Sequence, residues 1–395
     1  MPASLSHMRC ARCTPCLAAC LAALVAPTPH ACGTPRAYRG EMLLRIIGLM
    51  LLCCAPAVAA ERVYYIAADE VVWNYAPSGE NVLTGEPLTP DKSQLGFAYR
   101  KILYRGYTDA SFRTLQTRLP DDAYMGLLGP AIRAEVGDSV VVVFKNNSRL
   151  PLSFHVHGLR YLKTSEGAPY REDGTVAQKP GDAVAPGATY TYHFDVPERS
   201  GPGPMDPSSI VWMYHSHTDE LRDVNTGLVG PIVVTRRGVA RPDGTPRDVD
   251  REVFTMFAQI DESQSRLFKA NIADRTLNPR NLKPNDSSGF VDDNSMFTIN
   301  GYIYGNMPIV DVRQGERTRW YVMATMSDFD FHAPHWHGET VVINGMRTDT
   351  AELGPMGMLV ADMVPDNPGV WLYHCHLNIH LAAGMVARFR TIGAP

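Results

Sequence analysis

Cysteine is almost absent from the part of this chain that we expect to fold. Seven of the eight cysteines lie before residue 60, which leaves Cys375 alone in the rest of the sequence. A single cysteine cannot form an internal disulfide, so its thiol is expected to be either reactive or a metal ligand.

An excess of basic residues is also missing. The formal net charge is −4, and residues 1–60 hold five arginines against one glutamate. Residues 61–395 therefore carry 32 basic and 40 acidic residues. This balance gives no reason to expect nucleic acid as a partner.

Residues 42–60 have the three parts of a secretory signal peptide: a short basic start, an apolar middle and an end of small residues. Cleavage after Ala59 or Ala60 fits this pattern. Because the signal begins at Met42, we interpret residues 1–41 as an extraneous extension from a mis-set start codon. We expect export to the periplasm or secretion, with no stable membrane anchor in the mature chain.

Long helical periodicity is missing as well. Short runs of Val, Ile, Tyr and Phe alternate with Gly, Pro and Asn turns, which predicts an all-β chain. With 395 residues, 45% of them hydrophobic, the chain has room for about two domains. We expect a first domain over 61–235, a linker rich in Arg, Pro, Gly and Asp over 236–250, and a second domain over 251–395. The polar residues 270–295 predict a long loop.

The chemistry of the sequence is concentrated near its C-terminus. Alternating residues enter His374-Cys375-His376, which predicts a strand with Cys375 on one face and both histidines on the other. A thiolate with two imidazoles and a weak thioether is the ligand set of a blue-copper centre, and Cys375, His380 and Met385 supply three of the four. The flanking histidines are then free to hold a second metal group. A buried cysteine between two surface histidines is the alternative for an isolated motif, and His380 and Met385 argue against it.

Histidine is clustered in the same way elsewhere. Three more His-x-His pairs occur, at His155 and His157, His215 and His217, and His335 and His337. A single pair is equally well explained as a cross-strand polar pair, but ten of the 13 histidines lie in four clusters. His332 supplies the missing blue-copper ligand. Zinc needs only three or four ligands, usually with a carboxylate or several cysteines, whereas eight further imidazoles suit copper.

Two other features remain open. Asp173, in the loop between the first two pairs, is a candidate proton donor or else a turn residue. Four methionines form either a soft Cu(I) site or core packing; they are Met346, Met356, Met358 and Met363. Ser216 stands where the second half has Cys375, so the first domain should lack a blue copper.

At these motifs the sequence resembles the multicopper oxidases, specifically the two-domain kind with blue copper in the second domain. The stretches Gly129–Asp138 and Val196–Pro207 also look like those of ceruloplasmin and hephaestin. The resemblance implies two cupredoxin-like Greek-key β-sandwiches. It also implies a ligand set: His332, Cys375, His380 and Met385 for type 1 copper; His155 and His335 for type 2; and His157, His215, His217, His337, His374 and His376 for the type 3 pair.

The resemblance implies a reaction too. One type 1, one type 2 and two type 3 coppers per active unit would pass electrons from a small reductant through Cys375, His374 and His376 to O2, which is reduced to water. Ile379 stands where iron-oxidising relatives place an acid, so we expect laccase-like oxidation of phenols or aromatic amines over ferroxidase activity. The alternatives are a copper nitrite reductase and a non-catalytic copper-binding or electron-transfer protein, and neither needs four histidine motifs.

The motifs are divided between the two expected domains, two in each. A cluster that needs all four therefore forms only where unlike domains meet. Two-domain relatives achieve this by closing three chains head to tail. We accordingly expect a homotrimer with its clusters at chain interfaces, because a heterologous interface must close into a ring to avoid open polymers.

Overall fold

The computed structural model describes residues 59–172, 175–176, 179–284, 288–325 and 331–394. The extension at 1–41 and nearly all of the expected signal peptide lie outside these residues. Contacts group residues 57–395 into one unit. The division into domains at 61–235 and 251–395 therefore stays a prediction, although each half of the unit builds its own pair of sheets.

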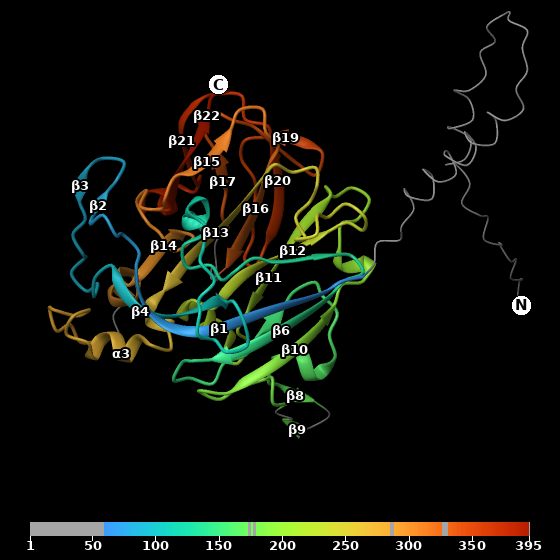
Figure 1. The fold of residues 1–395 in the computed structure, drawn as a ribbon. Coiled ribbons are helices and arrows are strands. Elements are labelled where there is room, and N and C mark those ends of the chain that lie inside the picture. The colour runs from blue at the N-terminus through green and yellow to red at the C-terminus, as the bar shows by residue number, and fades with distance from the viewer. Residues whose placement is uncertain (1–58, 173–174, 177–178, 285–287, 326–330, 395) are drawn as a thin grey trace, which may run out of the picture. The chain divides into compact units, whose positions relative to one another are not determined.

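The first half of the chain forms two four-stranded sheets (Figure 1). One has the order β10 (Thr189–Asp195), β6 (Ser139–Asn146), β1 (Glu61–Asn74) and β4 (Ala98–Tyr107). The other has the order β5 (Ile132–Glu135), β12 (Val229–Thr235), β11 (Ser209–His215) and β7 (His155–Val156). Small antiparallel pairs join β2 (Glu80–Asn81) to β3 (Glu86–Pro87) and β8 (Arg171–Glu172) to β9 (Thr175–Val176).

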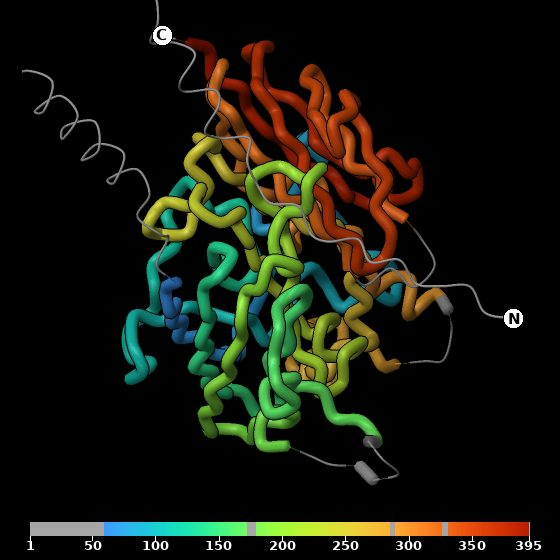
Figure 2. Tube along the Cα trace, turned by 90° about the vertical axis from the view of Figure 1, so that its right-hand side faces the viewer, coloured from blue at the N-terminus to red at the C-terminus, as the bar shows by residue number. Residues whose placement is uncertain are grey.

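The second half, which is the yellow to red part of the tube in Figure 2, also forms two sheets. The six-stranded sheet has the order β14 (Ser295–Ile299), β13 (Arg251–Asp261), β16 (Thr318–Thr325), β20 (Met358–Met363), β18 (Val341–Ile343) and β19 (Met346–Thr348). The four-stranded sheet has the order β15 (Val310–Arg313), β22 (Val386–Ile392), β21 (Gly369–Cys375) and β17 (Pro334–Trp336). The all-β prediction is confirmed.

The two sheets that carry the histidine motifs repeat one topology. In the first half β5 runs parallel to β12, which pairs antiparallel with β11, which pairs with β7. In the second half β15, β22, β21 and β17 follow the same order with the same directions. The register is repeated as well, because His155 lies opposite His215 and His335 lies opposite His374. Equivalent strands therefore carry equivalent histidines to the same end of each sheet.

A shared hydrophobic core joins the two halves. It contains Leu103 and Val233 from the first half together with Phe254 and Trp320 from the second. A second cluster, around Phe144, lies almost wholly in the first half. Strands β12 and β16 are buried along their whole length. For β12 this burial agrees with its largely apolar sequence, Val229–Thr235.

The helices are short. They are α2 (Glu220–Thr226), α3 (Phe268–Ala273), α4 (Ser288–Asp293), α5 (Asn378–Ala382) and the 3₁₀ turns η1 (Pro120–Met125), η2 (Lys163–Ser165), η3 (Glu198–Ser200) and η4 (Glu262–Gln264). The prediction of a loop over 270–295 was wrong in part, because the end of α3 and all of α4 fall within it. Among the described residues, no helix has both the length and the apolar character needed to span a bilayer.

Candidate metal centres

Four histidines gather at the end of β7 and β11. Ring nitrogens of His155, His157 and His215 all lie within 4.8 Å of one another. The Nε2 atoms of His157 and His215 are 2.9 Å apart. The ring of His217 lies 5.0 Å from that of His155, measured between centroids. We call these four residues the first-half histidines.

Four more histidines occupy the equivalent place at the end of β17 and β21. The Nε2 atom of His374 lies 2.9 Å from Nε2 of His337 and 3.2 Å from Nδ1 of His335. The exposed ring of His376 lies 5.0 Å from that of His335, between centroids. We call these the second-half histidines.

Backbone carbonyls fix the tautomers of three of these rings. Nδ1 of His155 lies 2.7 Å from the carbonyl oxygen of Glu166, Nδ1 of His215 lies 3.1 Å from that of Ser216, and Nδ1 of His374 lies 2.8 Å from that of Cys375. A carbonyl only accepts, so each Nδ1 carries the proton and each Nε2 keeps its lone pair. These Nε2 lone pairs are therefore available to a bound cation, and the Nε2 atoms of His215 and His374 each lie 2.9 Å from a second imidazole nitrogen that could bind the same group.

Burial favours the neutral form of four of these imidazoles. It lowers the pKa of His157 to about 4 and that of His215 to about 3, and it also lowers the pKa values of His335 and His374. A neutral imidazole is the form that binds a metal. These four rings can therefore act as ligands without first losing protons.

A separate group surrounds Cys375. Its Sγ atom lies 3.5 Å from Nδ1 of His380 and 4.0 Å from Nδ1 of His332, and all three side chains are buried. The amide of Ala333 donates a hydrogen bond to the same sulfur at 3.3 Å. Met385 is buried, and its carbonyl oxygen accepts the amide hydrogen of Cys375. One thiol and two imidazoles in a dry pocket match the strong ligands of a blue-copper site.

Consecutive residues of β21 serve the two kinds of group. His374 points to the second-half histidines, whereas Cys375 points to His332 and His380. The strand prediction, with cysteine and histidine on opposite faces, is confirmed.

All the predicted ligands are among the described residues, but Asp173 is not. Of the four methionines considered as a Cu(I) site, Met363 is in the core, Met356 and Met358 pack against it, and Met346 is exposed.

Two acids near the histidines were not predicted. Glu220 Oε2 lies 3.0 Å from Nε2 of His217, and this contact raises the pKa of His217 and lowers that of Glu220 to about 2. Asp349 Oδ2 lies 3.7 Å from Nε2 of His335. Glu220 follows His217 by three residues, and the turn into α2 brings the two side chains together. In the sequence, this short separation was the only sign that Glu220 contacts a histidine.

The two sets of histidines do not meet within one chain. Among the residues that the structure describes, every histidine ring contact and every group of close ligand atoms joins members of one half only. Each half therefore presents an incomplete set of four imidazoles.

Comparison with known proteins identifies the family of this chain. Two multicopper oxidase family models match residues 125–238 and 276–393. Human "Ferroxidase HEPHL1" is 38% identical over 84% of this chain and 29% of its own length. Rat hephaestin is 35% identical over 89% of this chain and 31% of its own, and rat ceruloplasmin 38% over 83% and 32%. The chain thus spans about a third of the length of these curated relatives.

Solved structures share the fold. The multicopper oxidase mgLAC is 20% identical with a TM-score of 0.55, covering 85% of this chain and 88% of its own. A copper nitrite reductase from Nitrosomonas europaea is 17% identical with a TM-score of 0.54, covering 84% and 94%. The cupredoxin-like β-sandwich fold is therefore confirmed, but it does not separate these two enzyme classes. The family models do, and the chain belongs to the multicopper oxidases, a family that uses copper.

Proposed function

We propose that the protein couples the one-electron oxidation of a small reductant to the four-electron reduction of O2 to water. The observation that carries this proposal is β21, whose adjacent residues His374 and Cys375 belong to two different ligand groups. Four coppers per active unit would be bound by the residues that the sequence predicts. Copper, when bound by these residues, would supply the redox chemistry that carries electrons from the reductant to O2.

The chain's own residues prepare both sites. The thiol of Cys375 is buried beside His332 and His380, which keeps water away from the electron-accepting centre. Backbone carbonyls orient His155, His215 and His374 so that Nε2 faces the cluster. Asp173 remains a predicted proton donor, since it lies outside the described residues.

Copper stoichiometry tests this proposal against both alternatives. We expect four coppers for each complete set of type 1 and cluster ligands, a blue absorption band and oxygen uptake with a reductant. One copper per chain without oxygen uptake would identify an electron carrier. Reduction of nitrite in place of O2 would identify a nitrite reductase.

We propose phenols or aromatic amines as the reductant. Phe297 packs against His380 with 4.9 Å between ring centroids, and the neighbouring side chains Ile379 and Phe331 are 65% and 63% exposed. Exposed apolar side chains next to predicted type 1 ligands suit an aromatic ring better than a hydrated metal ion.

Ferroxidase activity is the second candidate. It is favoured by the names of the relatives human "Ferroxidase HEPHL1" and its mouse counterpart, and by Asp328 and Asp330, which precede His332 in the sequence. We expect kcat/KM for a phenol to exceed that for Fe(II). Ile379→Asp should raise the Fe(II) value, whereas Ile379→Asn, which is similar in size but neutral, should not. A wild-type preference for Fe(II) would reverse the order of the two candidates.

We propose a homotrimer in which each cluster takes its first-half histidines from one chain and its second-half histidines from the next. The separation of the two sets within one chain supports this arrangement. A variant with His157→Ala and a variant with His337→Ala should each be inactive alone. Co-expressed, they should form mixed trimers that retain some intact clusters and some oxygen uptake. A wild-type monomer in light scattering with full copper and activity would exclude the trimer.

We also propose export, on the basis of the signal-peptide pattern in residues 42–60. The purified protein should begin at about residue 60 or 61. An N-terminal sequence that starts well before residue 59 would contradict both this proposal and the interpretation of residues 1–41.

A further inference from the structure

The first half contains a place that is equivalent to the Cys375 group but cannot bind copper in the same way. In the second half, the amide of Cys375 donates to the carbonyl oxygen of Met385 at 3.1 Å. In the first half, the amide of Ser216 donates to the carbonyl oxygen of Leu228 at 3.3 Å. Ser216 therefore corresponds to Cys375, and Leu228 to Met385.

The other two ligands have equivalents as well. The amide of Met385 donates to the carbonyl oxygen of His380, and that of Leu228 donates to the carbonyl oxygen of Asp223. Asp223 thus occupies the place of His380. The fourth position is held by Leu152, which lies three residues before His155 just as His332 lies three before His335. Each of the two forms an isolated β-bridge to a neighbouring segment.

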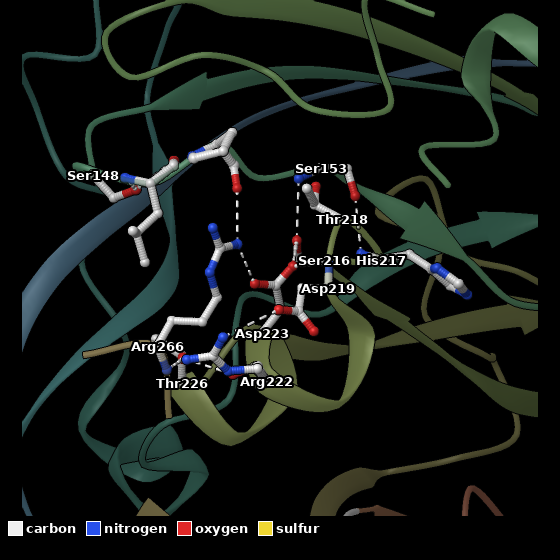
Figure 3. A network of polar contacts seen from close by, with 12 residues as sticks. Ser148, Ser153, Ser216, His217, Thr218, Asp219, Arg222, Asp223, Thr226 and Arg266 are labelled. Atoms are coloured by element: carbon white, nitrogen blue, oxygen red, sulfur yellow. Dashed lines mark hydrogen bonds and ion pairs between the residues drawn. The ribbon is translucent and has the colours of Figure 1, made fainter. Parts of the chain in front are cut away.

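An ion pair fills this place (Figure 3). Asp223 is completely buried, and its carboxylate accepts hydrogen bonds from Ser216 Oγ at 2.6 Å, the amide of Asp219 at 3.0 Å and Nη1 of Arg266 at 2.7 Å. Nη1 of Arg266 also donates to the carbonyl oxygen of Pro151 at 3.0 Å. Arg266 comes from the second half, just after η4.

The network continues to the segments that carry the first-half histidines. Ser216 Oγ accepts the amide hydrogen of Ser153 at 3.1 Å, and Ser153 Oγ accepts that of His217 at 2.9 Å (Figure 3). Ser216 lies between His215 and His217, and Ser153 lies two residues before His155. The segments before β7, after β11 and in α2 are thereby tied together.

These contacts resemble a metal cross-link in their effect. In the second half, copper at Cys375 would join the segment of His332, the end of β21 and α5. In the first half, Asp223 and its partners join the three equivalent segments without a metal. A buried ion pair is expensive to desolvate and contributes little net stability compared with apolar packing, so its directional hydrogen bonds are its clearest contribution.

We propose that Asp223 and Arg266 are a positioning pair, which holds the first-half histidines in the arrangement that binds cluster copper. The inference rests on the proposed function and extends it to residues that touch no copper. Residues beyond the direct ligands commonly change metal affinity by about 10–100-fold when they are replaced.

The test is Asp223→Asn, which keeps an acceptor for Ser216 but removes the anion beside Arg266. Holoprotein is dialysed against graded chelator, and retained copper and the blue band are measured separately. We expect cluster copper to be held about 10–100-fold more weakly, with the blue band of Cys375 unchanged. Ser216→Ala, a smaller perturbation, should weaken cluster copper by about 10-fold, and it provides a second measurement if Asp223→Asn folds poorly.

The matched control is Glu252→Gln. Glu252 pairs with Arg133 at 2.8 Å, also between the two halves and largely buried. Among the described residues, no hydrogen bond or ion pair joins this pair to a histidine. We expect this variant to keep wild-type copper affinity. The double variant Asp223→Asn with Arg266→Gln removes the unpaired charge, and it should still bind cluster copper weakly if the pair acts by positioning.

Three results would overturn the inference: wild-type cluster affinity in Asp223→Asn, parallel loss of the blue band, or full recovery of affinity in the double variant. A wild-type protein with one copper per chain would instead overturn the proposed function. The two failures are therefore distinguishable.

Discussion

Lys101→Met should be among the most destabilising single substitutions in this chain. Lys101 on β4 and Glu262 on η4 are both completely buried, and Nζ lies 2.6 Å from Oε1. Lys101 also donates to the carbonyl oxygen of Asn225, and the hydroxyl of Tyr75 donates to Glu262. Methionine replaces the aliphatic stem but leaves the carboxylate buried without its cation. Breaking such a pair from one side costs about 3–5 kcal/mol.

The loss of unfolding free energy caused by Lys101→Met should become smaller as pH falls. Burial raises the pKa of Glu262 above its ordinary value of 4.5, and Lys101 opposes that rise. Without Lys101, the folded chain binds a proton at Glu262 that the unfolded chain has already lost. The unfolding free energy of the variant therefore increases as pH falls through the folded pKa. Its deficit relative to wild type should be largest near neutral pH and smaller at about pH 5.

Urea unfolding of copper-free protein, followed by circular dichroism, measures this deficit without the contribution of bound metal. Lys101→Met with Glu262→Gln should recover most of the loss, because no charge is left buried. Arg160→Met is the control, since Arg160 pairs with Asp195 on the surface and should lose less than about 1 kcal/mol. A loss below about 1 kcal/mol for Lys101→Met, or a double variant no more stable than the single one, would refute the reasoning.

Two further predictions concern the metal and a surface ion pair. Cys375→Ser should abolish the blue band and substrate oxidation while leaving much of the cluster copper, as absorption and metal analysis would show; loss of all copper together would count against separate sites. The hydrogen bonds from Arg149 lower the pKa of Glu70, so the pair stabilises the fold above about pH 4.5 and loses that effect as pH falls through the lowered pKa. Arg149→Gln should therefore cost under about 1 kcal/mol at pH 7 in urea unfolding, and the cost should shrink as acid protonates Glu70. A cost that does not change with pH would contradict this assignment.

Local rules were enough to predict much of the site. The alternation of β21 placed Cys375 and His374 on opposite faces, and the structure confirms this with contacts to His380 and His337. Within each half the fold brings the two histidine motifs together, whereas the single cluster of all eight imidazoles stays a prediction. These predictions succeeded because each depends on a few consecutive residues whose geometry is set by the strand itself.

Contacts between distant segments could not be predicted in this way. Ser216 indicated only that a copper ligand is missing, and nothing in the sequence near it shows that Asp223 and Arg266 fill the place. Helix α3 was missed because six residues are too few for a periodic pattern, and its buried Asn271 looks like a loop residue until its hydrogen bond to the amide of Arg100 is known. The core shared by the two halves likewise depends on which apolar residues meet.

Because Cys375 is adjacent to His374, a single strand spans the distance between the two proposed copper sites. The bond lengths and pleat of a strand hardly vary, so this distance does not depend on how one half or chain packs against another. In the proposed trimer, a change at an interface would empty or fill the cluster but would not stretch this connection. Internal electron transfer should consequently be indifferent to solvent viscosity and to the proposed interfaces, while assembly and copper loading should be sensitive to both the interface and the ligand positions.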